Sequence, residues 1–122
     1  MEQLATLEAP VRKKKRNCDY LKQYFSFEEP PKEEAFLADN PDIVEILPSI
    51  AKDIKTNLDE NAQLVLHLLD MGEDWRTLFI YVYTRIDRKI TSHYQSVFFD
   101  KMFRLFPEIS KNLNLAFLHY EI

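Results

Sequence analysis

The second half of the chain switches between strand-like and helix-like patterns of apolar residues. Two apolar runs, at residues 64–69 and 78–83, flank a short polar break that contains the only glycine, Gly72. Successive residues of a strand point to opposite faces of a sheet, and both faces of both runs are largely apolar. The pattern predicts a β-hairpin that helices cover on one face and that is partly shielded on the other.

Two segments show the period of an amphipathic helix. Asn40 and Pro41 are typical of a helix start, and apolar residues continue at helical spacing to residue 58, although Pro48 should kink or split this helix. Asp87 is the expected N-cap of a second helix, over residues 88–106. Its apolar stripe is the most regular in the chain and comprises Ile90, Tyr94, Val97, Phe98, Met102, Leu105 and Phe106.

The two ends of the chain complete the predicted fold. Residues 113–122 alternate loosely as a final strand, and a strand-helix-strand connection favours parallel pairing through a right-handed crossover. Near the N-terminus, apolar residues between Asp19 and Phe27 share one helical face and predict a short helix that docks on the domain. The predicted fold class is α+β: a three-stranded sheet, formed by the hairpin plus the C-terminal strand, packed by two main helices, with a short helical N-terminal arm.

Composition is consistent with one folded domain. Of the 122 residues, 46% are hydrophobic and 13% aromatic, enough to bury a core that offsets the entropy of ordering. We expect residues 1–17 to form a basic flexible arm and residues 18–122 a single α+β domain. The single cysteine, Cys18, cannot form an internal disulfide, and no apolar run approaches the roughly 20 residues of a membrane helix. A cytoplasmic protein is therefore expected.

The formal net charge of −4 is unevenly distributed. Residues 1–16 carry a net charge of +3, residues 28–60 carry −7, and residues 61–122 are neutral. The positive charge lies in five adjacent residues: Arg12, Lys13, Lys14, Lys15 and Arg16. Such a run can hold nucleic-acid phosphates, but a solvated tail is the simpler interpretation, because the rest of the chain has no broad basic pattern.

Two features point instead to a protein partner. The acidic stretch over residues 28–42 can meet a basic partner, although a solvated face is the simpler interpretation. Trp75, the only tryptophan, follows the glycine in the hairpin link and would anchor an interface if it is exposed. The predicted partner-binding residues are Trp75, Glu33, Glu34 and Asp39.

Phe79, Tyr81 and Tyr83 form an aromatic row on one face of the second hairpin strand. Such a row can stack unpaired bases, so Tyr81 and Tyr83 combine with the basic run into an alternative nucleic-acid site. Ordinary packing under residues 20–27 is the favoured interpretation, because no glycine-rich RNA-binding motif accompanies the row.

Motifs for catalysis, metal binding or cofactor binding are absent from the sequence. His67, His93 and His119 lie far apart, without a second ligand three or four residues away. His67 and His119 fall in predicted strands and would meet only if those strands were neighbours. Cys18 has basic neighbours, but nothing near it in sequence supplies a general base. We predict no enzymatic activity, no cofactor and no metal site.

Four short segments carry a resemblance to other proteins. They are residues 25–31, residues 36–41, Leu64-Val65-Leu66, and residues 77–82, in that order. The order resembles that in a group of small uncharacterised bacterial proteins, over about residues 24–120. No assigned activity accompanies that group, so the resemblance implies only a bacterial, cytoplasmic origin.

Together these patterns favour a non-enzymatic protein-interaction module. It would be an antitoxin-like, immunity-like or regulatory subunit that binds another protein, with a homodimer possible and no membrane partner. The alternative is a nucleic-acid-binding domain that uses the basic run and the aromatic strand face. An enzyme is the third hypothesis, and its site would need His67 and His119 together in a cleft.

Overall fold

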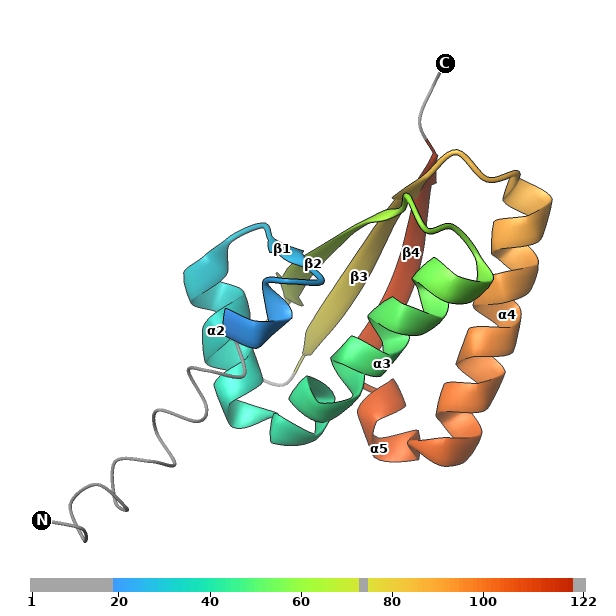
Figure 1. Ribbon diagram of the computed structural model, residues 1–122. Coiled ribbons are helices and arrows are strands. Elements are labelled where there is room, and N and C mark those ends of the chain that lie inside the picture. The colour runs from blue at the N-terminus through green and yellow to red at the C-terminus, as the bar shows by residue number, and fades with distance from the viewer. Residues whose placement is uncertain (1–18, 73–74, 120–122) are drawn as a thin grey trace, which may run out of the picture.

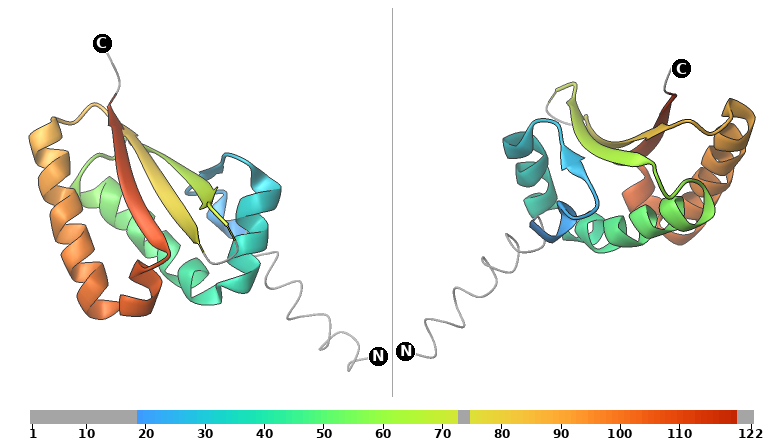
Figure 2. Two further views of the ribbon diagram at one scale, coloured as in Figure 1. Left: turned by 180° about the vertical axis from the view of Figure 1, so that it is seen from behind. Right: turned by 45° about the horizontal axis from the view of Figure 1, so that its top comes forward.

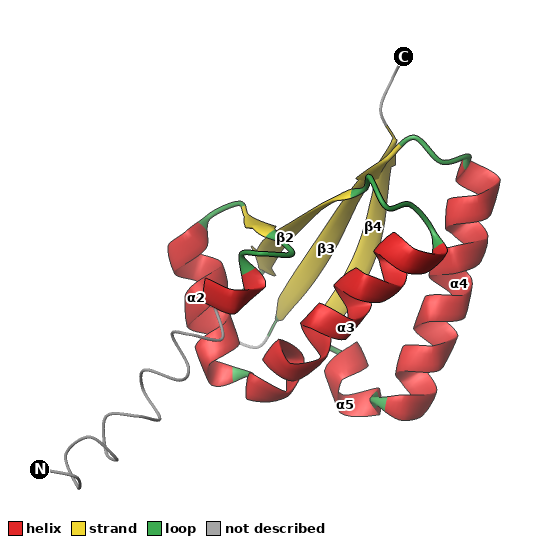
Figure 3. Cartoon of the chain, viewed as in Figure 1, coloured by secondary structure: helices red, strands yellow, loops and turns green. Residues whose placement is uncertain are grey.

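The computed structural model describes residues 19–72 and 75–119, which form a sheet layer and a helix layer (Figure 1). The sheet has four strands in the order β1-β2-β3-β4. The described helices lie on one side of this sheet or beside its edges, as the two further views show (Figure 2). The strands are β1 (Ser26–Phe27), β2 (Gln63–Asp70), β3 (Arg76–Thr84) and β4 (Leu113–His119). The helices are α2 (Pro30–Asp39), α3 (Pro41–Asn57), α4 (Arg88–Leu105) and α5 (Pro107–Ser110), as coloured in Figure 3.

The strand pairing confirms the α+β class and corrects the number of strands. Strands β2 and β3 form the predicted antiparallel hairpin, with Leu66 opposite Ile80. The final strand, β4, lies parallel to β3, as the strand-helix-strand connection predicted. The prediction of three strands is wrong, because β1 pairs parallel to β2 through Ser26 and Phe27. A strand of two residues is too short to show alternation, and the preceding residues 19–21 are helical, so the segment had the pattern of a helix.

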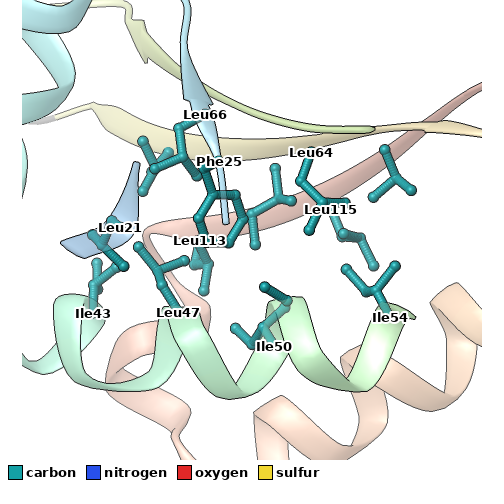
Figure 4. Packing of buried hydrophobic residues seen from close by; sticks show 14 of the residues in the cluster. Leu21, Phe25, Ile43, Leu47, Ile50, Ile54, Leu64, Leu66, Leu113 and Leu115 are labelled. Atoms are coloured by element: carbon teal, nitrogen blue, oxygen red, sulfur yellow. The ribbon is translucent and has the colours of Figure 1, made fainter. Parts of the chain in front are cut away.

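The core lies between α3 and one face of the sheet, which we call the inner face. Seven apolar strand residues on this face are at most 4% exposed: Leu64, Leu66, Leu78, Ile80, Val82, Leu113 and Leu115. From α3, the side chains of Ile43, Leu47, Ile50 and Ile54 point toward them (Figure 4). Burial of each such side chain stabilises the folded state by about 1.5–3 kcal/mol. The apolar spacing along α3 therefore has the predicted role.

The junction between α2 and α3 depends on two prolines and an asparagine. Pro30 and Pro41 occupy the first turns of α2 and α3, where a missing N–H costs nothing. Asn40 is the N-cap residue of α3, yet its amide donates to the carbonyl oxygen of Phe36 at 2.8 Å and so serves the end of α2. Pro48 was predicted to kink or split this helix, and it does not split it, since α3 continues through it.

Helix α4 forms where it was predicted, but only part of its predicted apolar stripe faces the domain. Asp87 caps it as expected, accepting from the backbone N–H of Lys89 at 2.9 Å. Thr91 and Met102 are buried, and Tyr94 and Phe98 pack on the core. By contrast, Ile90, Val97 and Leu105 are more than half exposed, so this part of the predicted apolar stripe does not face the core. Polar bonds to the margin of β4, described below, hold α4 beside the sheet edge rather than squarely over the sheet.

Gly72 lies in the link between β2 and β3. Its φ of 138° lies in the region that L side chains rarely adopt, which explains why the only glycine of the chain stands here. Its N–H donates to Oδ1 of Asp70 at 3.2 Å, and its carbonyl accepts from the N–H of Trp75 at 3.2 Å. The link thus places Trp75 at the end of the hairpin.

Candidate protein-interaction surface

The second face of the sheet, which we call the outer face, is not covered by any of the described helices (Figure 2). The register places these side chains on it: Val65, His67, Leu69, Thr77, Phe79, Tyr81, Tyr83, Asn114, Ala116 and Leu118. Most of them are half-buried by their neighbours, while Leu69 and Leu118 are 37% and 39% exposed. Contiguous apolar surface of this kind is typical of binding sites.

Three stacked rings occupy the middle of the outer face. The ring centroids of His67 and Tyr81 lie 5.4 Å apart with 20° between their planes. Those of Phe79 and Tyr81 lie 5.8 Å apart with 25° between their planes. The favoured packing of this row under residues 20–27 is wrong, because Leu21 and Phe25 of that segment belong to the inner core (Figure 4).

The aromatic stack is bordered by acidic charge. Nδ1 of His67 lies 2.8 Å from Oε2 of Glu28, a distance that gives an ion pair when the imidazole is protonated. Burial raises the pKa of the Tyr81 phenol, and the negative charge of Glu28 raises it further. A phenol with a raised pKa stays neutral at physiological pH, so Tyr81 offers an uncharged contact surface.

A cavity of about 420 Å³ lies at the Trp75 end of the outer face. Its apolar lining comes from Leu69, Trp75, Phe79, Phe99 and Leu113, and its polar lining includes Lys111 and Asn114. Trp75 is 69% exposed, so the predicted interface anchor is accessible. Exposed tryptophans beside apolar pockets are common centres of binding energy in protein interfaces.

Side chains bind the backbone groups of Leu115 on β4, which is an edge strand of the sheet. At the β4 edge, the side-chain amide of Gln95, on α4, donates to the carbonyl oxygen of Leu115 at 2.6 Å. The backbone N–H of Leu115 donates to Oδ1 of Asn114 at 2.8 Å. Farther along, the Thr91 hydroxyl lies 3.1 Å from Nε2 of His119. Edges blocked in this way resist pairing with another strand.

Glu33, one of the predicted partner-binding residues, is not accessible to a partner. It is fully buried, and its Oε1 accepts from the N–H of Glu29, the N-cap of α2, at 2.7 Å. Burial raises the pKa of the Glu33 carboxyl, although hydrogen bonds from the backbone of Glu29 and of Leu68 lower it.

The other predicted acidic residues lie on a different part of the molecule from Trp75. Glu34 and Asp39 belong to α2, and Oε1 of Glu34 lies 3.0 Å from Nζ of Lys22. Neither residue lines the cavity beside Trp75. The structure therefore divides the predicted partner-binding set between two surfaces. The basic run, Arg12 to Arg16, and Cys18 lie outside the described residues.

The histidine pair of the third hypothesis is not brought together. His67 lies on β2 and His119 on β4, with β3 between them, and their side chains point to opposite faces of the sheet. Within residues 19–72 and 75–119, no three His, Cys, Asp or Glu side chains are grouped in a way that can hold a metal ion.

Sequence reasoning missed Leu69, Phe99 and Leu118 as parts of this surface. Leu69 and Leu118 follow from strand alternation once the covered face is known. Phe99 has no such signal, because it reaches the cavity from α4, across the sheet edge.

Comparison of the chain with known protein families, curated protein sequences and solved structures finds no match. In the part of the chain that the structure describes, none of the helices has the length and apolar character needed to cross a membrane.

Proposed function

We propose that this protein is a non-enzymatic protein-interaction module whose contact surface is the outer face of the sheet. One observation carries the proposal: an apolar, aromatic face of the sheet is not covered by any of the described helices. Trp75 and its cavity supply the kind of anchor that concentrates binding energy. Such a module acts as an antitoxin-like, immunity-like or regulatory subunit in the cytoplasm.

A nucleic-acid-binding domain is the second candidate, because Tyr81 and Tyr83 lie on the open face together with Phe79. Two observations make a protein the better partner. The rings of His67, Phe79 and Tyr81 are stacked on one another, which leaves fewer ring faces for bases. The carboxylate of Glu28 also borders the stack, where it would repel phosphates.

Affinity capture from the native cell extract tests the proposal, with and without nuclease. We compare the tagged full chain with Leu118→Lys, on the outer face, and with Val97→Lys, a matched aliphatic-to-lysine control on α4. Val97 is 53% exposed, so both substitutions replace an accessible aliphatic side chain.

We expect one protein, recovered in stoichiometric amount, to be lost with Leu118→Lys and kept with Val97→Lys, whether or not nuclease is present. Recovery that disappears after nuclease treatment supports the nucleic-acid candidate. Equal recovery with all three chains shows that the outer face is not the contact surface.

A further inference from the structure

We propose that this protein binds an organic phosphate in a second cavity, of about 590 Å³, between the start of α4 and the end of β4. The polar part of its lining consists of Arg88, Thr91, Ser92, Gln95 and His119, and the rest of the lining is apolar. Its volume lies within the usual range of small-molecule sites. It shares no lining residue with the cavity beside Trp75, so it is a separate site.

A buried hydroxyl fixes the ring of His119 in this cavity. The Thr91 side chain is 1% exposed, and its hydroxyl donates to the carbonyl oxygen of Arg88 at 3.1 Å. Because a hydroxyl has a single proton, Oγ1 of Thr91 accepts from the Nε2–H of His119, also at 3.1 Å. The neutral imidazole therefore has its lone pair on Nδ1, the nitrogen that Thr91 leaves to a ligand.

The charge of the lining favours an anion. Arg88 and His119 are basic, and among residues 19–72 and 75–119 no carboxylate lines this cavity. Asp87, the acid next to Arg88 in sequence, accepts from the backbone N–H of Lys89 as the N-cap of α4. Arg88 is also the first residue of α4, so the positive end of the helix dipole adds to the attraction of its guanidinium.

The lining groups match a phosphoryl group better than a carboxylate. Arg88 and Ser92 are four residues apart on α4, so their side chains lie on the same side of the helix. A guanidinium binds two oxygens of a phosphate together, and a hydroxyl can donate to the third. A phosphate monoester titrates near about pH 6, so it can donate a proton to Nδ1 of neutral His119 or accept one from the protonated ring.

The apolar part of the lining indicates an organic body beside the phosphoryl group. It comes from Ala116, Phe117 and Leu118, of which Ala116 and Leu118 also belong to the outer face. The ring of Phe117 packs edge-on against Tyr94, with centroids 6.2 Å apart, so it forms a fixed wall. Apolar walls with a few well-placed polar groups are typical of small-molecule sites. We therefore expect a phosphate monoester with an aromatic or aliphatic substituent.

NMR titration of the full chain with phenyl phosphate, at constant ionic strength, tests this proposal. The imidazole resonances of His119 report on the cavity, while His67 and His93 are internal references because neither lines it. We expect His119 alone to shift, with a dissociation constant on the order of 1 mM.

Two variants test the role of the guanidinium. Arg88→Gln removes it from the cavity, and Arg104→Gln removes the same group from the last turn of α4 as the matched control. Both arginines are exposed, so both variants should fold, which circular dichroism verifies. We expect Arg88→Gln to weaken binding of phenyl phosphate about 10-fold or more and Arg104→Gln to leave it unchanged.

Benzoate carries a carboxylate on the same ring and distinguishes the two classes of anion. Binding several-fold weaker than that of phenyl phosphate supports the proposal, whereas equal binding contradicts the assignment of a phosphate. The site itself is overturned if His119 does not shift at about 20 mM phenyl phosphate, if all three histidines shift equally, or if Arg88→Gln binds as the wild-type chain does. Partner capture through the outer face is measured separately, so these failures leave the proposed function in place.

Discussion

The inner and outer faces of one sheet differ in composition and in cover. The inner face presents leucine, isoleucine and valine side chains that are at most 4% exposed under α3. The outer face presents aromatic and aliphatic side chains, most of them half-buried, which none of the described helices covers. Branched aliphatic side chains fill a closed core at high density, whereas large rings with polar tips suit a surface that meets water or a partner. The inner face therefore stabilises the fold, and we propose the outer face as the recognition surface.

The largest effect should come from the centre of the inner face. Ile80→Ala removes a fully buried side chain, and the cavity it leaves should lower the free energy of unfolding by about 3 kcal/mol. Urea denaturation measures this loss. The neighbouring outer-face change Tyr81→Phe keeps the ring and should cost less than about 1 kcal/mol. Equal losses from the two variants would remove the distinction between the faces.

The buried carboxylate at the β1 edge should give the next effect. Glu33→Ala leaves the N–H of Glu29 without its acceptor in a part-buried site, so we expect a loss of about 2 kcal/mol in the free energy of unfolding. Thermal or urea denaturation checks it. Glu34→Ala, on the same helix but half-exposed, is the control and should change stability by less than about 0.5 kcal/mol. Similar losses from the two variants would show that the buried hydrogen bond of Glu33 adds nothing to stability.

The same residue predicts a pH dependence. Burial raises the pKa of the folded Glu33 carboxyl above its value in the unfolded chain. Between those two pKa values the folded state binds more protons, so the contribution of Glu33 to stability falls as pH rises through this window. Relative to Glu33→Gln, the wild-type chain should therefore gain unfolding free energy as pH falls from 7 toward 4. Parallel pH profiles of the two chains would contradict this.

A smaller effect should follow from loosening α4. The Tyr94 hydroxyl donates to Oδ2 of Asp53 and links α4 to α3, and burial together with this hydrogen bond raises the pKa of the phenol. Tyr94→Phe keeps the ring against Phe117 and should cost about 1 kcal/mol in urea denaturation. Tyr20→Phe, whose exposed hydroxyl bonds only to Tyr24 among the described contacts, should cost nothing measurable. If Tyr94→Phe leaves the free energy of unfolding unchanged, packing alone holds α4 against the domain.

The smallest effect on stability should accompany the largest effect on binding. Leu118→Lys adds a charge at a position that is already 39% exposed, so its unfolding free energy should stay within about 0.5 kcal/mol of wild type. The same variant should lose partner capture. A folded Leu118→Lys variant that still captures the partner would show that the outer face is not the contact surface.

Strand alternation was sufficient to predict the hairpin and its two apolar faces, but not which face is open. That distinction depends on where residues 19–27 pack, and a two-residue strand such as Ser26–Phe27 leaves almost no signal in the sequence. The exposed side of α4 could not be predicted either. Its orientation depends on tertiary hydrogen bonds from Thr91 and Gln95 to β4, which the apolar spacing of Ile90, Val97 and Leu105 does not reveal.

The candidate site was predictable only in its aromatic part. Trp75 and Tyr81 stood out as large rings in a hairpin, and both lie on or beside the outer face. Glu33 looked like one more member of a solvated acidic stretch, because burial of a single carboxylate depends on backbone donors that only the folded chain brings near.

Hydroxyl-radical footprinting tests the central claim most directly. The tagged full chain is oxidised as dilute purified protein and again in native extract, and mass spectrometry quantifies labelling at Phe79, Tyr81 and Leu118. Phe103 and Leu105 on α4, which are 70% and 60% exposed, serve as internal references. The account predicts several-fold protection of the three outer-face residues in extract, with the references unchanged. Unprotected outer-face residues, or protection confined to α4, would contradict it.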